Sequence, residues 1–126
     1  MNNKKNRKIV IIFSDNNQSR GIATALVNIS KDIVTINNPI KAIDYIKTEE
    51  CFLVITETEF NIIDGENYLR ELIGLGHIRN LIIIDHGANY NFKNSPGLNI
   101  YFIYKPININ NLINKVKNLI INKEMT

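Results

Sequence analysis

The stretch FLVITETEFNIIDG, residues 52–65, joins a short apolar run to a loop that closes on Asp64-Gly65. Continuous apolar runs of this length are typical of parallel strands covered on both faces. Glu57 stands where this run ends, and the ends of parallel strands are where ligand sites lie in open α/β sheets. The stretch therefore predicts a buried strand that ends on a carboxylate, and the role of Glu57 becomes the central question.

Similar runs recur along the chain and alternate with segments of helical spacing. The other predicted strands are residues 8–13, 32–36, 81–84 and 100–104. Helices are expected after the capping side chains of DNNQS (15–19), from Asn38-Pro39 onward, over 65–76 and over 108–120. Strict alternation of this kind predicts an α/β fold, a doubly wound five-stranded parallel sheet with helices on both faces.

One segment breaks the alternation. Residues 86–99, HGANYNFKNSPGLN, occupy the place of a helix between the last two strands. They include two glycines, a proline and four asparagines, and no apolar stripe, so helix propensity is poor throughout. We expect this fourth helix to be short or absent.

The bulk properties indicate one soluble domain. A chain of 126 residues fits a single core, so residues 1–126 are expected to form one domain, with 1–7 as a flexible basic tail. The net charge is only +3 and no basic face carries interleaved aromatics, so we expect no direct nucleic-acid contact. No run is long enough to cross a membrane, which favours a cytoplasmic protein. The single cysteine, Cys51, excludes an internal disulfide and is expected to be buried.

The predicted strand ends gather the polar residues that could carry chemistry. The first strand leads to Ser14 and Asp15, and the third ends at Glu57. The fourth leads to Asp85, followed by His86, and the fifth leads to Lys105. Three carboxylates and one ammonium are thus expected at one edge of the sheet.

This layout resembles the receiver domain of two-component response regulators, the CheY-like family, over essentially the whole chain. In that family an acidic pair that holds Mg²⁺ ends the first strand, and the phosphoryl-accepting aspartate ends the third. An Asp-Gly follows seven residues after the acceptor, the fourth strand ends in Thr or Ser, and the fifth in Lys-Pro. The matching segments here are FSDNNQSR (13–20), Glu57 with Asp64-Gly65, LIIIDHG (81–87) and YKP (104–106). The resemblance implies the strand order 2-1-3-4-5.

Most of the strand-end residues that could carry chemistry differ from the family's pattern. Ser14 replaces the first acid of the pair, Glu57 replaces the acceptor aspartate and Asp85 replaces the hydroxyl residue, while Asp15 and Lys105 are retained. One extra methylene displaces the attacking oxygen by more than about 1 Å, and such shifts cost about 10²-fold in rate. An ionised carboxylate at position 85 would also repel the incoming phosphoryl dianion. We therefore expect a pseudo-receiver that is not phosphorylated by the family's mechanism.

A divalent ion is not required by this interpretation. Losing one of two acidic ligands weakens a magnesium site, although Asp15, Glu57 and the backbone carbonyl of Glu59 could still hold Mg²⁺ weakly. A zinc site is not expected because His77 and His86 lack metal-ligand spacing.

Two hypotheses remain for Glu57. Its charge stands roughly where an aspartyl phosphate would place its own, so an ion pair with Lys105 could hold the domain in one state. Alternatively, these residues are relaxed and no longer act. Phe102 occupies the place of the family's aromatic switch residue, although simple packing is the alternative for an aromatic on a strand.

The resemblance implies a receiver module of a bacterial two-component system. We expect it to act without turnover of a substrate, through contact with a protein partner such as a sensor kinase or an output protein, and to form homodimers in some settings. Three alternatives stay open. They are the receiver part of a longer DNA-binding regulator, a still-phosphorylatable receiver with Mg²⁺ in an altered site, and a flavodoxin-like module for a small ligand. The last is disfavoured because no phosphate-binding loop follows the first strand.

Overall fold

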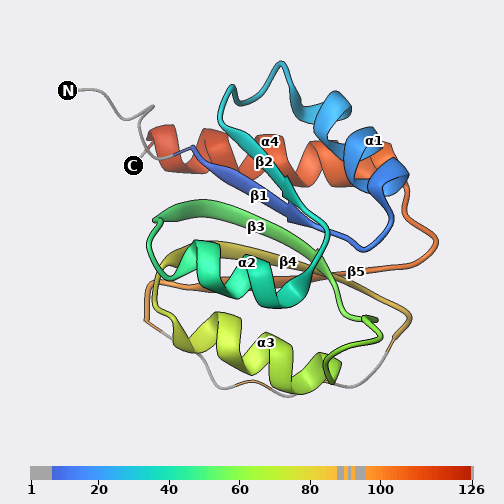
Figure 1. The fold of residues 1–126 in the computed structure, drawn as a ribbon. Coiled ribbons are helices and arrows are strands. Elements are labelled where there is room, and N and C mark those ends of the chain that lie inside the picture. Colours follow the sequence, from blue (N-terminus) through green and yellow to red (C-terminus); the bar gives the residue numbers. More distant parts are fainter. Residues whose placement is uncertain (1–6, 88–89, 91, 93–95, 126) are drawn as a thin grey trace.

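A computed structural model describes residues 7–87, 90, 92 and 96–125, with the side chains described as far as residue 121. Its strands form one parallel sheet in the order β2-β1-β3-β4-β5, as predicted (Figure 1). The described elements are β1 (Ile9–Ile12), α1 (Asn16–Leu26), β2 (Ile33–Ile36), α2 (Pro39–Ile46), β3 (Cys51–Glu57), α3 (Gly65–Gly74), β4 (Ile78–Asp85), β5 (Asn99–Tyr104) and α4 (Ile109–Met125).

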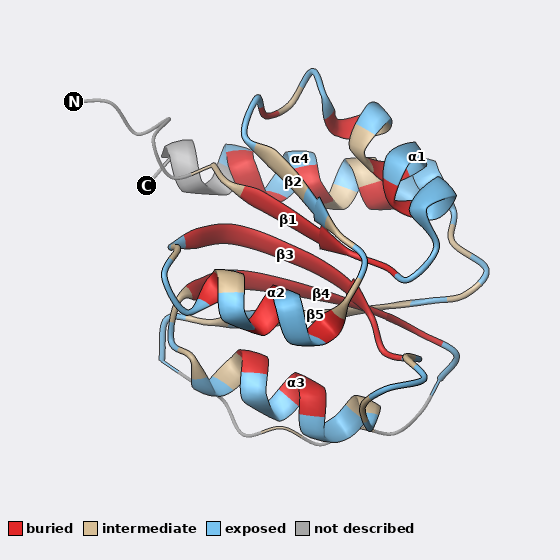
Figure 2. Ribbon diagram, viewed as in Figure 1, coloured by how far each residue is buried: buried red, intermediate tan, exposed pale blue. Residues whose placement is uncertain are grey.

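The central strands are buried because helices cover both faces of the sheet (Figure 2). All seven residues of β3 are buried, which agrees with the unbroken apolar run in the sequence. Successive residues of β1 point to opposite faces, so Ile9 and Ile11 pack with α1 and α4, while Val10 and Ile12 pack with α2 and α3. The sheet thus separates two hydrophobic layers. Cys51 is buried in the second layer, as predicted.

Side-chain caps begin all four described helices, with Asn108 before α4 accepting the N–H of Asn111. The Asn38 side chain accepts hydrogen bonds from the N–H groups of Ile40 and Lys41, and Pro39 is the first residue of α2, as the sequence indicated. Asp15 caps α1 and Asp64 caps α3 in the same way. The caps satisfy N–H groups that have no partner inside a helix, so each fixes where its helix begins.

No helix lies between β4 and β5 in the described part of the chain, and this agrees with the expectation for residues 86–99. The described aromatic residues of that segment pack instead on the sheet face that carries α2 and α3. Tyr90 stacks on Phe92 and on Phe102 of β5, and Phe102 stacks on Tyr104, with interplanar angles of 11–12°. A row of aromatic rings therefore covers part of the face where a helix was due.

The basic tail predicted for residues 1–7 stays a prediction, because residues 1–6 lie outside the described residues. Arg7, the last residue of that tail, is described, and its carbonyl oxygen accepts a 2.8 Å hydrogen bond from Ser30 Oγ. Among the helices described, none is both long and apolar enough to span a bilayer.

Candidate functional site

The carboxylate of Glu57 is held by Ser14. Glu57 is the last residue of β3 and only 5% exposed, and it lies beside Ile84 in the register with β4. Ser14 follows β1 closely, and β1 is the other neighbour of β3. Both its backbone N–H and its Oγ donate to Glu57 Oε2, at 2.6 and 2.8 Å. Hydrogen bonds to a carboxylate are stronger than those between neutral groups, so Ser14 fixes the orientation of this side chain.

The second oxygen of Glu57 faces Lys105. Lys105 Nζ lies 3.8 Å from Glu57 Oε1 and 3.6 Å from Glu59 Oε1. The lysine side chain is 19% exposed, so its ammonium sits at the margin of the cleft between one buried and one exposed carboxylate. The predicted approach of Lys105 to Glu57 is therefore present in the structure. At 3.8 Å the contact is a loose ion pair that a small movement would tighten.

Asp85 is buried at the end of β4, where its carboxylate accepts two hydrogen bonds. The Thr58 hydroxyl donates a short hydrogen bond to Asp85 Oδ1, and the N–H of Gly87 donates to Oδ2 at 3.0 Å. The backbone N–H of Lys105 donates to the carbonyl oxygen of Asp85, which ties β5 to β4. Asp85 thus lies at the predicted edge, with partners that the sequence alone did not suggest.

His86 and Glu59 extend the site toward solvent. His86 Nε2 lies 3.0 Å from Glu59 Oε1, the same oxygen that Lys105 approaches. Both side chains are about 60% exposed, and a surface pair of this kind contributes little to stability. Glu59 is therefore shared between a histidine and a lysine at the rim of the cleft.

Asp15 stabilises the start of α1. Its carboxylate accepts the N–H of Asn17 at 2.8 Å and caps α1, and the residue is exposed. Within the described residues no three His, Cys, Asp or Glu side chains are grouped to hold a metal ion. The suggested magnesium ligands, Asp15, Glu57 and the Glu59 carbonyl, stay a prediction. Any ion would have to compete with Ser14 and Lys105 for the Glu57 oxygens.

Phe102 is half-buried in the aromatic row, with its ring centroid 6.5 Å from that of Tyr90 and 6.4 Å from that of Tyr104. Burial raises the pKa of the Tyr90 phenol, a hydrogen bond with Thr58 works in the opposite direction, and the charge of Asp85 raises it further. Phe102 thus stacks on Tyr90, and Tyr90 is hydrogen-bonded to Thr58, the residue that donates to Asp85. The contact between the Phe102 and Tyr90 rings is expected both of a packing residue and of a switch residue.

Sequence reasoning missed Thr58, Tyr90 and the side chain of Glu59. Thr58 and Glu59 follow Glu57 directly, so their position after the strand end was the available signal. Tyr90 carried no such signal because it lies in a segment without apolar periodicity. Its hydroxyl would lie 3.3 Å from a Cβ atom built on Gly65. The same Cβ atom would lie 2.6 Å from the Thr58 carbonyl oxygen, so Gly65 is required by close approach of the backbone.

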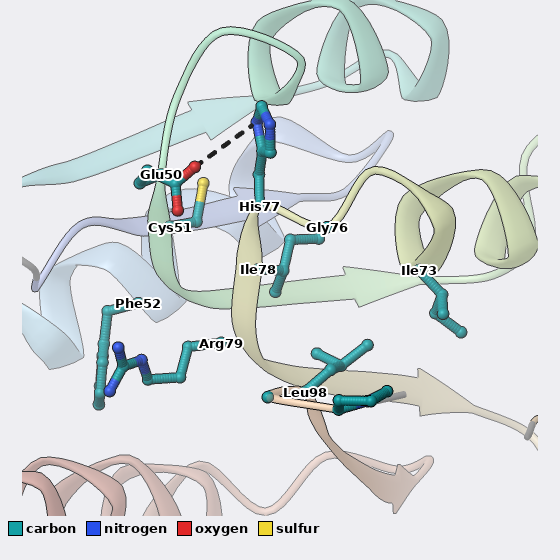
Figure 3. Close-up of a pocket in the computed structure, with 11 residues that line it drawn as sticks. Glu50, Cys51, Phe52, Ile73, Gly76, His77, Ile78, Arg79 and Leu98 are labelled. Carbon is teal, nitrogen blue, oxygen red and sulfur yellow. Dashed lines mark ion pairs between the residues drawn. The ribbon is translucent and has the colours of Figure 1, made fainter. Parts of the chain in front are cut away.

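A separate hollow of about 280 Å³ lies at the opposite end of β3 and β4 (Figure 3). Glu50 and His77 face each other there at 3.9 Å, and His77 Nδ1 also lies 2.8 Å from the carbonyl oxygen of Ile46. Burial raises the pKa of the neighbouring Cys51 thiol to about 12, which keeps it protonated and unreactive near neutral pH. This hollow contains none of the residues that the sequence placed in the site.

Comparison with solved structures reveals the same fold in receiver domains. The receiver domain protein (CheY-like) of Methanospirillum hungatei JF-1 has a TM-score of 0.75 and 17% identity, covering 96% of this chain and 99% of its own. The receiver domain of the putative LuxO repressor of Vibrio parahaemolyticus has a TM-score of 0.72 and 17% identity, with 95% and 97% covered. The two-component transcriptional regulator AraC of Clostridium phytofermentans has 0.72 and 15%, with 90% of each chain covered.

No model of a protein family and no curated protein matches the sequence. At these identities the structural likeness establishes the CheY-like fold, and the role of the site rests on its own residues.

Proposed function

We propose that this chain is a receiver-like signalling module that works by contact with a protein partner, without phosphotransfer. Its fold is that of CheY-like receivers, and its site keeps the lysine and one acid of their pattern. The module would reside in the cytoplasm and turn over no substrate. The partner would be a sensor kinase or an output protein of a two-component system.

The observation that carries the proposal is the state of the Glu57 carboxylate. One oxygen accepts two hydrogen bonds from Ser14, and the other faces Lys105. A nucleophilic carboxylate needs a free oxygen aligned with the phosphoryl group and a cation on the transferring oxygens. In this site the contacts that would position a phosphoryl group are made to the carboxylate itself.

The same contacts explain how a signal state could be maintained without phosphate. Glutamate reaches one methylene farther than aspartate, and its charge lies within 3.8 Å of the Lys105 ammonium. An aspartyl phosphate would offer its charge to the same lysine. We infer that Glu57 keeps the lysine in the position that phosphorylation would otherwise produce. The surface that contacts the protein partner would then stay in one conformation.

Treatment with acetyl phosphate and with beryllofluoride tests the absence of phosphotransfer. Intact mass should be unchanged after acetyl phosphate and Mg²⁺, and amide NMR shifts near Glu57 should not respond to beryllofluoride. The matched control is the triple variant Ser14→Asp, Glu57→Asp and Asp85→Thr, which restores the family's acids and its hydroxyl residue and should gain a response. A phosphoryl adduct on Glu57 of the unaltered protein would refute the proposal.

A second candidate is the receiver part of a longer transcriptional regulator. One similar structure is described as a two-component transcriptional regulator, and another as the signal receiver domain of a putative repressor. A coding sequence that continues past Thr126 into a helix-turn-helix would support this candidate. Glu57 would then set a constant state of the attached DNA-binding domain.

A further inference from the structure

The outer side of β5 is a free strand edge in the described part of the structure. β5 is the last strand of the sheet and pairs only with β4. The N–H of Lys105 donates to the Asp85 carbonyl and so points toward β4. Backbone groups alternate sides along a strand, so those of Tyr101 and Ile103 also face β4. The N–H and C=O groups of Ile100, Phe102 and Tyr104 therefore point outward, and no described residue bonds to them.

Within the described residues, this edge carries no charge, proline or bulge that would prevent pairing. Natural edge strands are kept short or carry charges, prolines or bulges. The six residues of β5 include no charge and no proline, and the register with β4 is continuous. The opposite edge strand, β2, has only four residues and is preceded by the charged Lys31 and Asp32. Of the two edges, β5 is the one suited to accept another strand.

The sequence of β5 is complementary to itself when it is reversed. Antiparallel pairing centred on Phe102 sets Ile100 opposite Tyr104 of a second copy, and Tyr101 opposite Ile103. Each of these pairs joins a β-branched residue to an aromatic one, and Phe102 meets Phe102. Aromatic pairs and aromatic–β-branched pairs are among the favourable cross-strand combinations. The next pair outward joins Asn99 and Lys105, so no like charges meet.

The same register satisfies every outward backbone group. Residues directly opposite each other in an antiparallel ladder alternate between hydrogen-bonded and non-bonded pairs. With Phe102 at the centre, the bonded pairs are Phe102 with itself and Ile100 with Tyr104 in both directions. These are the three residues whose N–H and C=O groups point outward. A shift by one residue would bring opposite sheet faces together, which a two-fold axis perpendicular to the sheet forbids.

We propose that β5 pairs antiparallel with β5 of a second copy of this chain, with Phe102 on the two-fold axis. The two five-stranded sheets become one continuous sheet. The Phe102 rings meet across the axis and join the aromatic rows of the two copies. Tyr104, 55% exposed in the single chain, becomes covered by Ile100 of the other copy. This interface is independent of the chemistry at Glu57 and does not rest on the proposed function.

Disulfide trapping tests the register. In a Cys51→Ala background, Phe102→Cys should form a disulfide dimer under mild oxidation, because bonded opposite residues have Cα atoms about 5.5 Å apart. Tyr104→Cys alone should form no disulfide within the dimer, since its two cysteines would be about 13 Å apart along the strands. An equal mixture of Ile100→Cys and Tyr104→Cys proteins should form the mixed dimer. Circular dichroism verifies that each variant is folded.

A charge exchange gives a second and independent readout. Phe102→Lys and Phe102→Glu each place like charges opposite each other and should weaken the dimer at least tenfold, while their mixture should recover it. Sedimentation from low micromolar to near-millimolar concentration measures both effects. A folded wild-type protein that stays monomeric over this range overturns the proposal and leaves the edge for a different extended chain. Equal trapping of Phe102→Cys and Tyr104→Cys overturns it as well.

Discussion

Ser14 donates two hydrogen bonds to a single oxygen of Glu57, although 43 positions separate the two residues in the chain. In the family that this fold resembles, an acid stands at the place of Ser14. A serine at this place converts a repulsive pair of carboxylates into a donor and an acceptor. The residues at positions 14 and 57 are thus matched as hydrogen-bond donor and acceptor.

Removing the Ser14 hydroxyl should loosen Glu57. Ser14→Ala keeps the backbone donor but loses the bond from Oγ, and we expect the free energy of unfolding to fall by about 1–2 kcal/mol. Urea unfolding followed by circular dichroism measures this change. Ser30→Ala is a control of a different kind, since Ser30 Oγ bonds to a carbonyl oxygen and not to a carboxylate. Additive losses in Ser14→Ala and Glu57→Ala would contradict the interpretation, because the bond between Ser14 Oγ and Glu57 Oε2 cannot be lost twice.

Lys105 should be coupled more strongly to Glu57 than to Glu59. Glu57 is nearly buried, whereas the side chain of Glu59 is 59% exposed and its charge is screened by water. Double-mutant cycles of Lys105→Met with Glu57→Gln and with Glu59→Gln measure the two couplings. We expect about 1 kcal/mol or more for the first and below about 0.5 kcal/mol for the second. Equal couplings would show that Lys105 does not hold Glu57.

Two glycines should respond in opposite ways to the same substitution. A Cβ atom on Gly65 would lie 2.6 Å from the Thr58 carbonyl oxygen, so Gly65→Ala must displace backbone and should destabilise the protein by about 1–3 kcal/mol. Gly21 lies inside α1 with nothing within 4 Å of the added atom. Gly21→Ala should therefore stabilise it by about 0.5–1 kcal/mol. Thermal unfolding of both variants beside the wild type checks the opposite signs.

The buried thiol should make stability fall at alkaline pH. Burial raises the pKa of Cys51 from 9.0 to about 12, so the folded state retains a proton that the unfolded chain releases. The contribution of Cys51 is complete below pH 9 and is lost as the pH rises toward 12. Cys51→Ala should show a shallower decline than wild type between these values in urea unfolding. A steeper decline in the variant would contradict this assignment, since other groups that titrate there are common to both proteins.

The sequence predicted the fold because its signals are local. The apolar runs, the Asn38-Pro39 start of α2 and the alternation of elements each depend on neighbouring residues, and alternation leaves few topologies. The sequence also identified Glu57 as the strand-end residue of the candidate site, because Asp64-Gly65 marks the end of the loop after β3. Glu57 and Lys105 were expected at one edge, and the structure brings them together.

Only the tertiary structure decided which partners these residues take. The bonds of Ser14 to Glu57 and of Thr58 to Asp85 join different strand ends, and side-chain packing selects them. The aromatic cover that Tyr90 provides came from a segment with no periodicity, so no local pattern could reveal it. The sequence by itself determined the elements, their order and the strand-end residues, because these depend on propensity and spacing. Hydrogen-bond partners and the free edge of β5 depend on distances between remote segments, which exist only in the folded chain.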